Sequence, residues 1–338
     1  HDPRPGGKAM TKDIIVSSRV RLARNYADLP FRLKAKPQDG EACIRRTLDA
    51  LRDLPESYTF YQLRSMGETE RGCLVEDHLI SPDLLMHEEE GAALIRGDEK
   101  ISVMMNEEDH LRIQAFSPGD QLQEAAENAF AIEDTLERRL SFAFDAQLGY
   151  LTACPTNTGT GMRASAMLHL PMLTISKQMG KVNQLAAKLG LTLRGIYGEG
   201  SEARGFLYQL SNQVTLGRTE QELLETVGAV ARQIAEMERV FRSKVWEKDP
   251  VGFEDQLNRS LGLMRFARRM NEKEFMTHWS NLRMGAAMEK LPLSLETCDA
   301  VLKAAQPAHV KKLAGRELTP REQEEKRSDM LRAALQEG

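Results

Sequence analysis

A stretch in the middle of the chain, residues 146–198, carries cationic side chains but no acid. It contains Arg163, Lys177, Lys181, Lys188 and Arg194, so its formal charge is +5. Local positive charge of this density favours a site for a multiply charged anion. A buried, strand-rich core, in which charges are scarce, would also lack acids. Composition alone leaves both interpretations open.

A nucleotide bound in this stretch would be held largely by arginine side chains. The chain has no GxxxxGK[ST] segment, which excludes a P-loop as the phosphate site. The segment GTGMRA at 159–164 has dinucleotide-fingerprint spacing, but the ribose-binding acid expected about 20 residues later is missing. A guanidinium group donates two parallel hydrogen bonds to phosphate oxygens, so arginine suits the task.

A second polar cluster, NEEDHLR at 106–112, follows the apolar segment ISVMM at 101–105. Taken alone it is most simply an acidic turn at the end of a strand. Its interpretation changes when it is considered together with three other segments. These are SSRVR at 17–21, CPTNTGTGMRAS at 154–165 and RGIYGEGSEA at 194–203.

The four segments, in this order and with this internal spacing, resemble the phosphagen (ATP:guanidino) kinase family. The resemblance covers roughly residues 13–217. It implies an enzyme that transfers the γ-phosphoryl group of ATP to a guanidinium. It also implies that Mg²⁺ is held through the ATP phosphates, with no metal ligand from protein side chains.

The resemblance implies roles for individual residues. Glu108 corresponds to the carboxylate that holds the guanidinium and acts as base, Glu199 to a second carboxylate, and Cys154 to a reactive cysteine beside the substrate nitrogen. Five arginines correspond to a clamp on the phosphates: Arg19, Arg21, Arg112, Arg163 and Arg194. The rest of the implied nucleotide site is Ser17, Ser18, Val20, His78, Ala164, Ser165, Ala166, Met167, Gly195, Ile196, Tyr197, Gly198 and Glu199 itself.

These residue types suit the implied reaction. A guanidinium has a pKa above about 12, so its nitrogen is a poor nucleophile until a carboxylate aligns it and takes a proton. Phosphoryl transfer itself mainly needs in-line positioning and neutralised phosphate oxygens. Cys154 precedes Pro155 among clustered cations, a setting that favours a thiolate, whereas a free cysteine elsewhere is commonly a small buried hydrophobe.

The surroundings of the motifs indicate which guanidine is the acceptor. Kinases for creatine or free arginine place a helical domain before SSRVR, whereas here that motif begins at Ser17. We therefore expect a site open enough for an arginine on another protein. The segments YGEGSEA and LVEDHLISP resemble the bacterial protein arginine kinases, a branch of the family. A kinase for free arginine and a non-catalytic phosphoarginine-reading adaptor remain alternatives.

In that branch a C-terminal helical domain binds phosphoarginine through an RDxxRA-like motif, and phosphoarginine marks proteins for the Clp protease. The best match here is SDMLRA at 328–333, with Ser328 at the first arginine position. Arg327, Asp329 and Arg332 are the candidate phosphoarginine site, with a solvated helix face as the alternative. The branch further implies a homodimer or higher homo-oligomer and, for some members, a zinc-containing activator.

The elements expected to position these residues form an α+β fold, an antiparallel sheet flanked by helices and followed by an all-helical domain. We predict strands at 58–64, 72–75, 101–105 and 112–116 and a strand opening the segment 13–34. Helices are expected at 39–54, 121–143, 176–189 and 220–245, with several more over 254–336, the last starting at a capping box on Thr319. The expected domains are 11–235, catalytic, and 236–338, helical.

The overall composition excludes several protein classes. The formal charge of −4 among 338 residues argues against a nucleic-acid partner, and no apolar run is long enough for a membrane span. The first ten residues do not have the pattern of a signal peptide. Four scattered cysteines without CxxC spacing (Cys43, Cys73, Cys154 and Cys298) lead us to expect the reducing cytoplasm.

Overall fold

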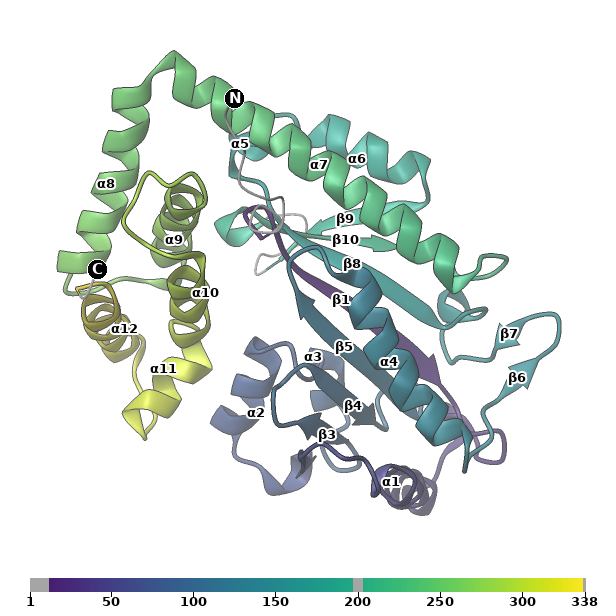
Figure 1. Cartoon of the computed structure of the whole chain (residues 1–338). Helices are drawn as coiled ribbons and strands as arrows, with labels where there is room; N and C mark the ends of the chain where they lie inside the picture. The colour runs from purple at the N-terminus through teal and green to yellow at the C-terminus, as the bar shows by residue number, and fades with distance from the viewer. Residues whose placement is uncertain (1–11, 197–202, 337–338) are drawn as a thin grey trace.

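An antiparallel sheet organises the larger part of the molecule (Figure 1). The computed structural model describes residues 12–196 and 203–336. The strands are β1 (Ile15–Arg24), β2 (Tyr58–Gln62), β3 (Ala92–Arg96), β4 (Ile101–Met105), β5 (Leu111–Pro118), β8 (Met162–His169), β9 (Leu191–Gly195) and β10 (Leu207–Asn212). They form one eight-stranded sheet in the order β2-β3-β4-β5-β1-β8-β10-β9, and β6 (Phe144–Asp145) and β7 (Gly149–Tyr150) form a separate hairpin.

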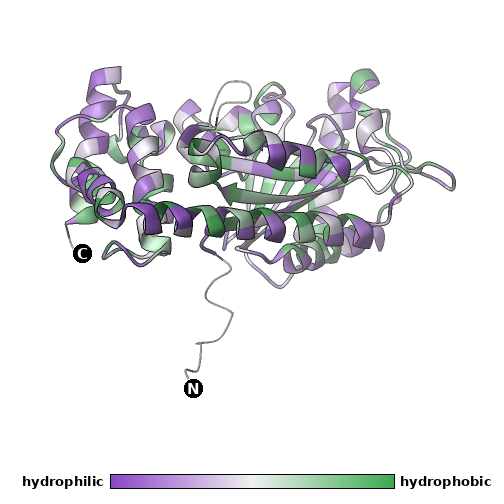
Figure 2. Cartoon of the chain, turned by 90° about the horizontal axis from the view of Figure 1, so that it is seen from above, coloured by the Kyte–Doolittle hydropathy of each residue, from purple (hydrophilic) through white to green (hydrophobic). Residues whose placement is uncertain are grey.

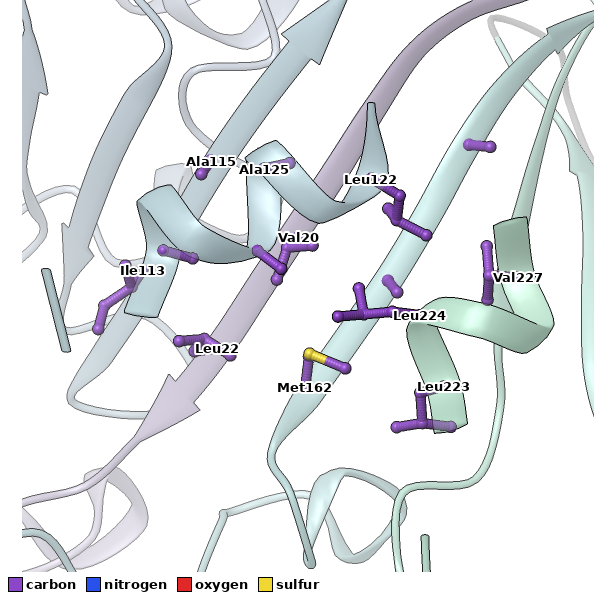
Figure 3. Packing of buried hydrophobic residues seen from close by; sticks show 14 of the residues in the cluster. Val20, Leu22, Ile113, Ala115, Leu122, Ala125, Met162, Leu223, Leu224 and Val227 are labelled. Carbon is purple, nitrogen blue, oxygen red and sulfur yellow. The ribbon is translucent and has the colours of Figure 1, made fainter. Parts of the chain in front are cut away.

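One face of the sheet is covered by helices. These are α1 (Pro37–Leu51), α4 (Leu122–Glu137), α6 (Met179–Lys188) and α7 (Glu220–Lys248). Figure 3 shows Val20 and Leu22 of β1 packed under α4, with Leu224 of α7 over β8. Because successive strand residues point to opposite faces, burying Val20 and Leu22 here turns Arg19 and Arg21 to the other face.

The opposite face is only partly covered. Over β3 and β4 lie α2 (Glu68–Glu76), α3 (Pro82–Leu85) and a small apolar cluster that includes Leu79, Leu84 and Met104. The connections of this part of the chain also contain a short helix, α5 (Pro171–Ile175), and four 3-10 turns, at Arg32–Lys34, Leu63–Ser65, Pro155–Asn157 and Arg204–Phe206. The middle strands of the sheet are therefore left for a site on this side.

The predicted strand at 72–75 is wrong, because these residues lie in helix α2. A short apolar run does not distinguish strand from helix by its periodicity. Here the helix is started by Glu70, whose carboxylate accepts a hydrogen bond from the backbone N–H of Gly67. The other four predicted strands correspond to β1, β2, β4 and β5, whereas β3 and β6 to β10 were not predicted as individual strands.

The C-terminal part is helical, as expected. It consists of α8 (Pro250–Phe266), α9 (Glu272–Ala287), α10 (Leu295–Ala304), α11 (Pro307–Ala314) and α12 (Pro320–Leu335). Its core surrounds the buried Trp279, whose indole N–H donates to the carbonyl of Cys298 at 2.8 Å. The predicted capping box at Thr319 is confirmed. In Figure 2 the strands are mainly hydrophobic, while the helices on either side also carry polar residues. The predicted α+β class is confirmed.

A buried polar network joins the two parts along α7, which continues without a break through residue 235. Glu238 of α7 accepts hydrogen bonds from the backbone N–H groups of Met172 and Leu173 and from Arg242. Arg242 donates to the ring Nδ1 of His169, at the end of β8, and the ring Nε2 donates to Ser280 of α9 at 2.7 Å. The helical part is thus fastened to the strands that carry the arginines.

Because of this network, we expect the free energy of unfolding to decrease as the pH is lowered below about 6.5. Burial and the nearby Arg283 and Arg242 charges lower the pKa of His169 well below its usual value. The unfolded chain therefore binds a proton that the folded chain cannot, which costs up to about 1.4 kcal/mol per pH unit. Denaturant unfolding of wild type and His169→Gln between pH 5 and pH 8 measures the difference. Parallel pH profiles would contradict this role.

Candidate active site

Four of the five predicted clamp arginines line one cavity on the open face of the sheet. Its volume is about 370 Å³, and Arg19, Arg21, Arg163 and Arg194 line it together with Gly195, Ile196, Gln209 and Ser211. The strand register explains the grouping, because Arg21 of β1 lies opposite Arg163 of β8, and Arg194 of β9 opposite Gln209 of β10. Arg112, on β5, lies close enough for its charge to lower the pKa of Arg21 and of Arg163.

The arginines are held at an electrostatic cost. Burial, with the charges of Arg19, Arg112 and Arg163, lowers the pKa of Arg21 well below its usual value. Burial and the neighbouring Arg194 and Arg112 lower the pKa of Arg163 as well. The Nε of Arg21 is buried without a hydrogen-bond partner in the part of the chain that the structure describes. A polyanion would relieve both the repulsion and the missing hydrogen bond.

Neighbouring side chains fix the guanidinium groups. Arg19 donates to the Gln209 side chain at 2.8 Å, and Arg163 donates to the Ser211 hydroxyl at 3.3 Å. Arg112 donates to a carboxylate oxygen of Glu107 at 2.7 Å. Gln209, Ser211 and Glu107 are not among the residues predicted from the sequence motifs. Gln209 and Ser211 are two residues apart in β10, so their side chains lie on the same face of the strand. This alternation is the sequence signal that could have identified them.

Glu107 and Glu108 are adjacent in the sequence but lie in different environments. Glu107 is only 1% exposed and bonds to the Ser81 hydroxyl as well as to Arg112. The side chain of Glu108 is 45% exposed, and its nearest carboxylate oxygen lies 3.9 Å from Arg112. Partial burial, Asp109 and Glu107 raise the pKa of Glu108. Glu108 is therefore an accessible carboxylate at the edge of the cationic site.

Asp109 ties this turn to the segment of Cys154. It is buried, and one carboxylate oxygen accepts hydrogen bonds from the Asn25 side chain at 2.6 Å and from the backbone N–H of Ala153 at 2.7 Å. Cys154 is partly exposed, and its Sγ lies 3.0 Å from the Thr156 hydroxyl. It lies close enough to Arg163 to act electrostatically on it, in the direction that raises the pKa of Arg163. The structure thus brings Cys154 to the same side as Glu108.

A second cavity of about 280 Å³ adjoins the arginine cavity, with Arg19, Ile196 and Gln209 lining both. Of the predicted nucleotide residues, it contains Ser17, His78, Ser165 and Met167 in addition. Gln114 of β5 holds the carbonyl of His78 at 2.7 Å, and His78 has a left-handed backbone with φ of 59°. Burial, followed by the charge of Arg19, lowers the pKa of His78 to about 4, so its imidazole is neutral at pH 7.

The remaining predicted residues lie elsewhere. The side chains of Val20, Ala164 and Ala166 belong to the hydrophobic core on the helix-covered face. The hydroxyl of Ser18 donates to the carbonyl of Gly119 at 2.7 Å. Tyr197, Gly198 and Glu199 lie outside the described residues. Across residues 12–196 and 203–336, no group of three or more His, Cys, Asp or Glu side chains is placed to hold a metal ion. No helix described is long and apolar enough to cross a membrane.

The C-terminal candidates do not converge on one pocket. Arg327 is buried, and its guanidinium donates to the carbonyls of Ala305 and Met270, both at 2.9 Å. Arg332 donates to the carbonyl of Ala267 at 2.7 Å and pairs with the exposed Asp329. Arg327 and Arg332 thus fasten α12 to the ends of neighbouring helices.

Comparison with known proteins extends these observations. Residues 40–241 match the model of the ATP:guanido phosphotransferase C-terminal catalytic domain, and residues 250–338 that of the protein-arginine kinase McsB C-terminal domain. The protein-arginine kinase of Caldanaerobacter subterraneus subsp. tengcongensis is 42% identical over 96% of this chain and 97% of its own length. That of Brevibacillus brevis is 42% identical over 97% of this chain and 94% of its own.

Solved structures show the same fold. The crystal structure of lombricine kinase has a TM-score of 0.60 at 23% identity, covering 69% of this chain and 68% of that one. The duplicated taurocyamine kinase from Schistosoma mansoni has a TM-score of 0.62 at 26% identity, covering 73% of this chain and 37% of that one. With its arginine-lined sheet face and these matches over most of its length, the chain belongs to the ATP:guanido phosphotransferase family.

Proposed function

We propose that this chain is an ATP-dependent protein-arginine kinase, which transfers the γ-phosphoryl group of ATP to the guanidinium of an arginine side chain in a protein. The observation that carries the proposal is the arginine-lined cavity with the accessible carboxylate of Glu108 at its edge. Cations suit the phosphates of the donor, and a carboxylate suits the cationic acceptor. The names of the similar full-length relatives support the same reaction.

The arginines act on the phosphates of ATP. Arg19, Arg21, Arg163 and Arg194 would hold the phosphate oxygens. Arg112 pairs with Glu107, lies 3.9 Å from Glu108 and affects the pKa of Arg21 and Arg163. Among the residues that the structure describes, no carboxylate lines the arginine cavity, a donor set that fits Mg²⁺ held through the phosphates. Bound in that way, Mg²⁺ supplies further neutralisation of the phosphate charge. The protein's own contribution is the fixed position of the guanidinium groups.

Glu108 acts on the acceptor. Its carboxylate aligns the substrate guanidinium and takes a proton from the attacking nitrogen. A nitrogen–phosphorus bond then forms while the bond from the γ-phosphorus to the bridging oxygen breaks, leaving ADP. The raised pKa of Glu108 makes it a stronger base than an ordinary carboxylate. Cys154 is proposed as a neighbour of the acceptor nitrogen, and Glu199, outside the described residues, as the second carboxylate.

Several features of the proposal come from the family resemblance and the relatives. We propose that the acceptor arginine is presented by a protein, and that the chain has a catalytic domain at 11–235 and a helical domain at 236–338. The chain would form a homo-oligomer in the cytoplasm, and its partners would include the Clp protease system and a zinc-containing activator. The exposure of Glu108 supports an acceptor presented on a protein chain. For the phosphoarginine site, the contacts of Arg327 and Arg332 with backbone carbonyls favour a structural role, and Asp329 is the exposed member.

The reaction is tested by incubating the full chain with Mg-ATP and an unfolded substrate protein. Phosphoarginine is then measured by mass spectrometry at mild pH. We expect wild type to form phosphoarginine and Glu108→Gln to lose roughly 10²- to 10⁴-fold in rate, because the general base is removed. Glu41→Gln, an exposed position on α1, is the matched control. The proposal fails if wild type forms no phosphoarginine, and efficient turnover of free arginine in competition with protein would favour the free-arginine kinase.

The phosphate clamp is tested by nucleotide affinity. Arg163→Gln should weaken ADP binding about 10- to 100-fold, since a hydrogen bond to a charged group contributes about 1.5–3 kcal/mol. Lys181→Gln removes a cation from the same acid-free stretch, but from the exposed surface of α6, and should change the affinity less than twofold by comparison. Isothermal titration measures both. Equal effects of the two substitutions would show that only the overall charge of the stretch matters.

A further inference from the structure

The 280 Å³ cavity beside the arginines has a wall that comes from the helical part of the chain. Asp299, Leu302 and Lys303 line it from α10, and Gln306 lines it from the residue pair that joins α10 to α11. The spacing of the first three places them on one side of the helix. They face side chains of the catalytic sheet, which lies far away in the sequence. The four residues of this wall lie outside the sequence motifs of the kinase family.

The cavity has the chemistry of a site for a flat heterocycle. Phe116, Met167, Ile196 and Leu302 provide apolar surface, and His78 provides a neutral imidazole. Small-molecule sites are typically of this kind, mostly apolar with a few polar groups that fix orientation. A cavity of about 280 Å³ lies close to the lower end of their usual range of volumes. The four arginines that suit phosphate gather in the neighbouring cavity, and of these only Arg19 also lines this one.

Gln306 is the polar group of the helical wall with hydrogen-bonding capacity to spare. It is 4% exposed, and its side-chain N–H donates to the carbonyl of Leu302 at 3.2 Å. Its side-chain oxygen accepts no hydrogen bond from the residues that the structure describes. Because Gln306 lines the cavity, this oxygen is an acceptor that remains available to a ligand or a water molecule there. It is therefore placed to accept a hydrogen bond from an amino group of a base.

We infer that the wall formed by Asp299, Leu302, Lys303 and Gln306 completes the nucleoside-binding part of the ATP site. The inference rests on the proposed function, because phosphates held by the arginines fix where the nucleoside must lie. The two cavities are continuous through Arg19, Ile196 and Gln209, which line both. A nucleotide thus bridges the catalytic sheet and the helical part.

A set of charged contacts holds this wall in place. Glu76, near the end of α2, accepts hydrogen bonds from the backbone N–H groups of Ala308 and His309, at the start of α11. Asp77 pairs with His309 at 2.9 Å and with Lys303 at 3.2 Å. The next residue, His78, lines the same cavity. Lys303 is therefore a positioning residue, which sets the distance between α10 and His78.

The inference is tested with two probes on the full chain, ADP and inorganic tripolyphosphate, which has no nucleoside. Gln306→Ala should weaken ADP binding about tenfold and leave tripolyphosphate binding within about twofold, since one hydrogen bond to the nucleoside is lost. Gln306→Met, which keeps the volume of the side chain but removes its amide, should weaken ADP binding as much as Gln306→Ala does. ADP affinity restored to the wild-type value in Gln306→Met would show instead that truncation loosens the fold, and would overturn the inference. Lys303→Met should weaken ADP binding more than Lys273→Met, the matched change at an exposed position of α9. Isothermal titration gives each affinity.

The kinetic readout separates nucleotide positioning from a general loss of structure. Gln306→Ala and Lys303→Met should raise KM for ATP while kcat changes little. Unchanged ADP affinity in both Gln306 variants, or equal losses for ADP and tripolyphosphate, would overturn the inference. Arg163→Gln provides the opposite pattern, because it should weaken both probes. If wild type binds ADP but phosphorylates no arginine, the proposed reaction fails, whereas the ratio of the two probes still decides the nucleoside wall.

Discussion

The repulsion among arginines on one face of the sheet is the constraint on which the rest of the structure depends. Arg19, Arg21 and Arg163 lie in a shared cavity, and burial and mutual charge lower the pKa of Arg21 and Arg163. The folded chain can hold such a cluster only because the same strands bury apolar side chains under α4 and α7. Strand alternation thus links the hydrophobic core directly to the cationic site.

The carboxylates divide the opposite charges between two tasks. Glu107 is buried and pairs with Arg112, whereas Glu108 stays accessible beside it. Asn106, which has a left-handed backbone with φ of 63°, turns the chain just before these residues. Asp109 then fixes the segment of Cys154 through the N–H of Ala153. One short turn therefore separates a buried carboxylate that serves the fold from an accessible carboxylate that we propose acts on the acceptor.

The sequence predicted the family, the α+β class and the four arginines that line the arginine cavity, but not Gln209 or Ser211 beside them. Those predictions rest on local motifs and on the period of a strand. Local signals do not show which of two adjacent carboxylates is buried, since that depends on contacts of Glu107 with Ser81 and Arg112. They misassigned 72–75, a short apolar run that forms α2. They also gave no indication of Gln306, because its place in the cavity comes from packing between distant segments.

Repulsion among the buried arginines should destabilise the free protein, and bound polyphosphate should remove that cost. The most direct measurement is the free energy of unfolding of Arg21→Met with and without tripolyphosphate. Arg21 is a buried charge whose surroundings are mainly of the same sign, with Glu107 the opposing one. Replacing Arg21 by an apolar side chain of similar length should stabilise the free protein, by analogy with replaced buried ion pairs, for which the gain is about 1–4 kcal/mol. Stabilisation by tripolyphosphate should be largely lost in the variant. A variant that is less stable alone, yet still fully stabilised by tripolyphosphate, would contradict the account.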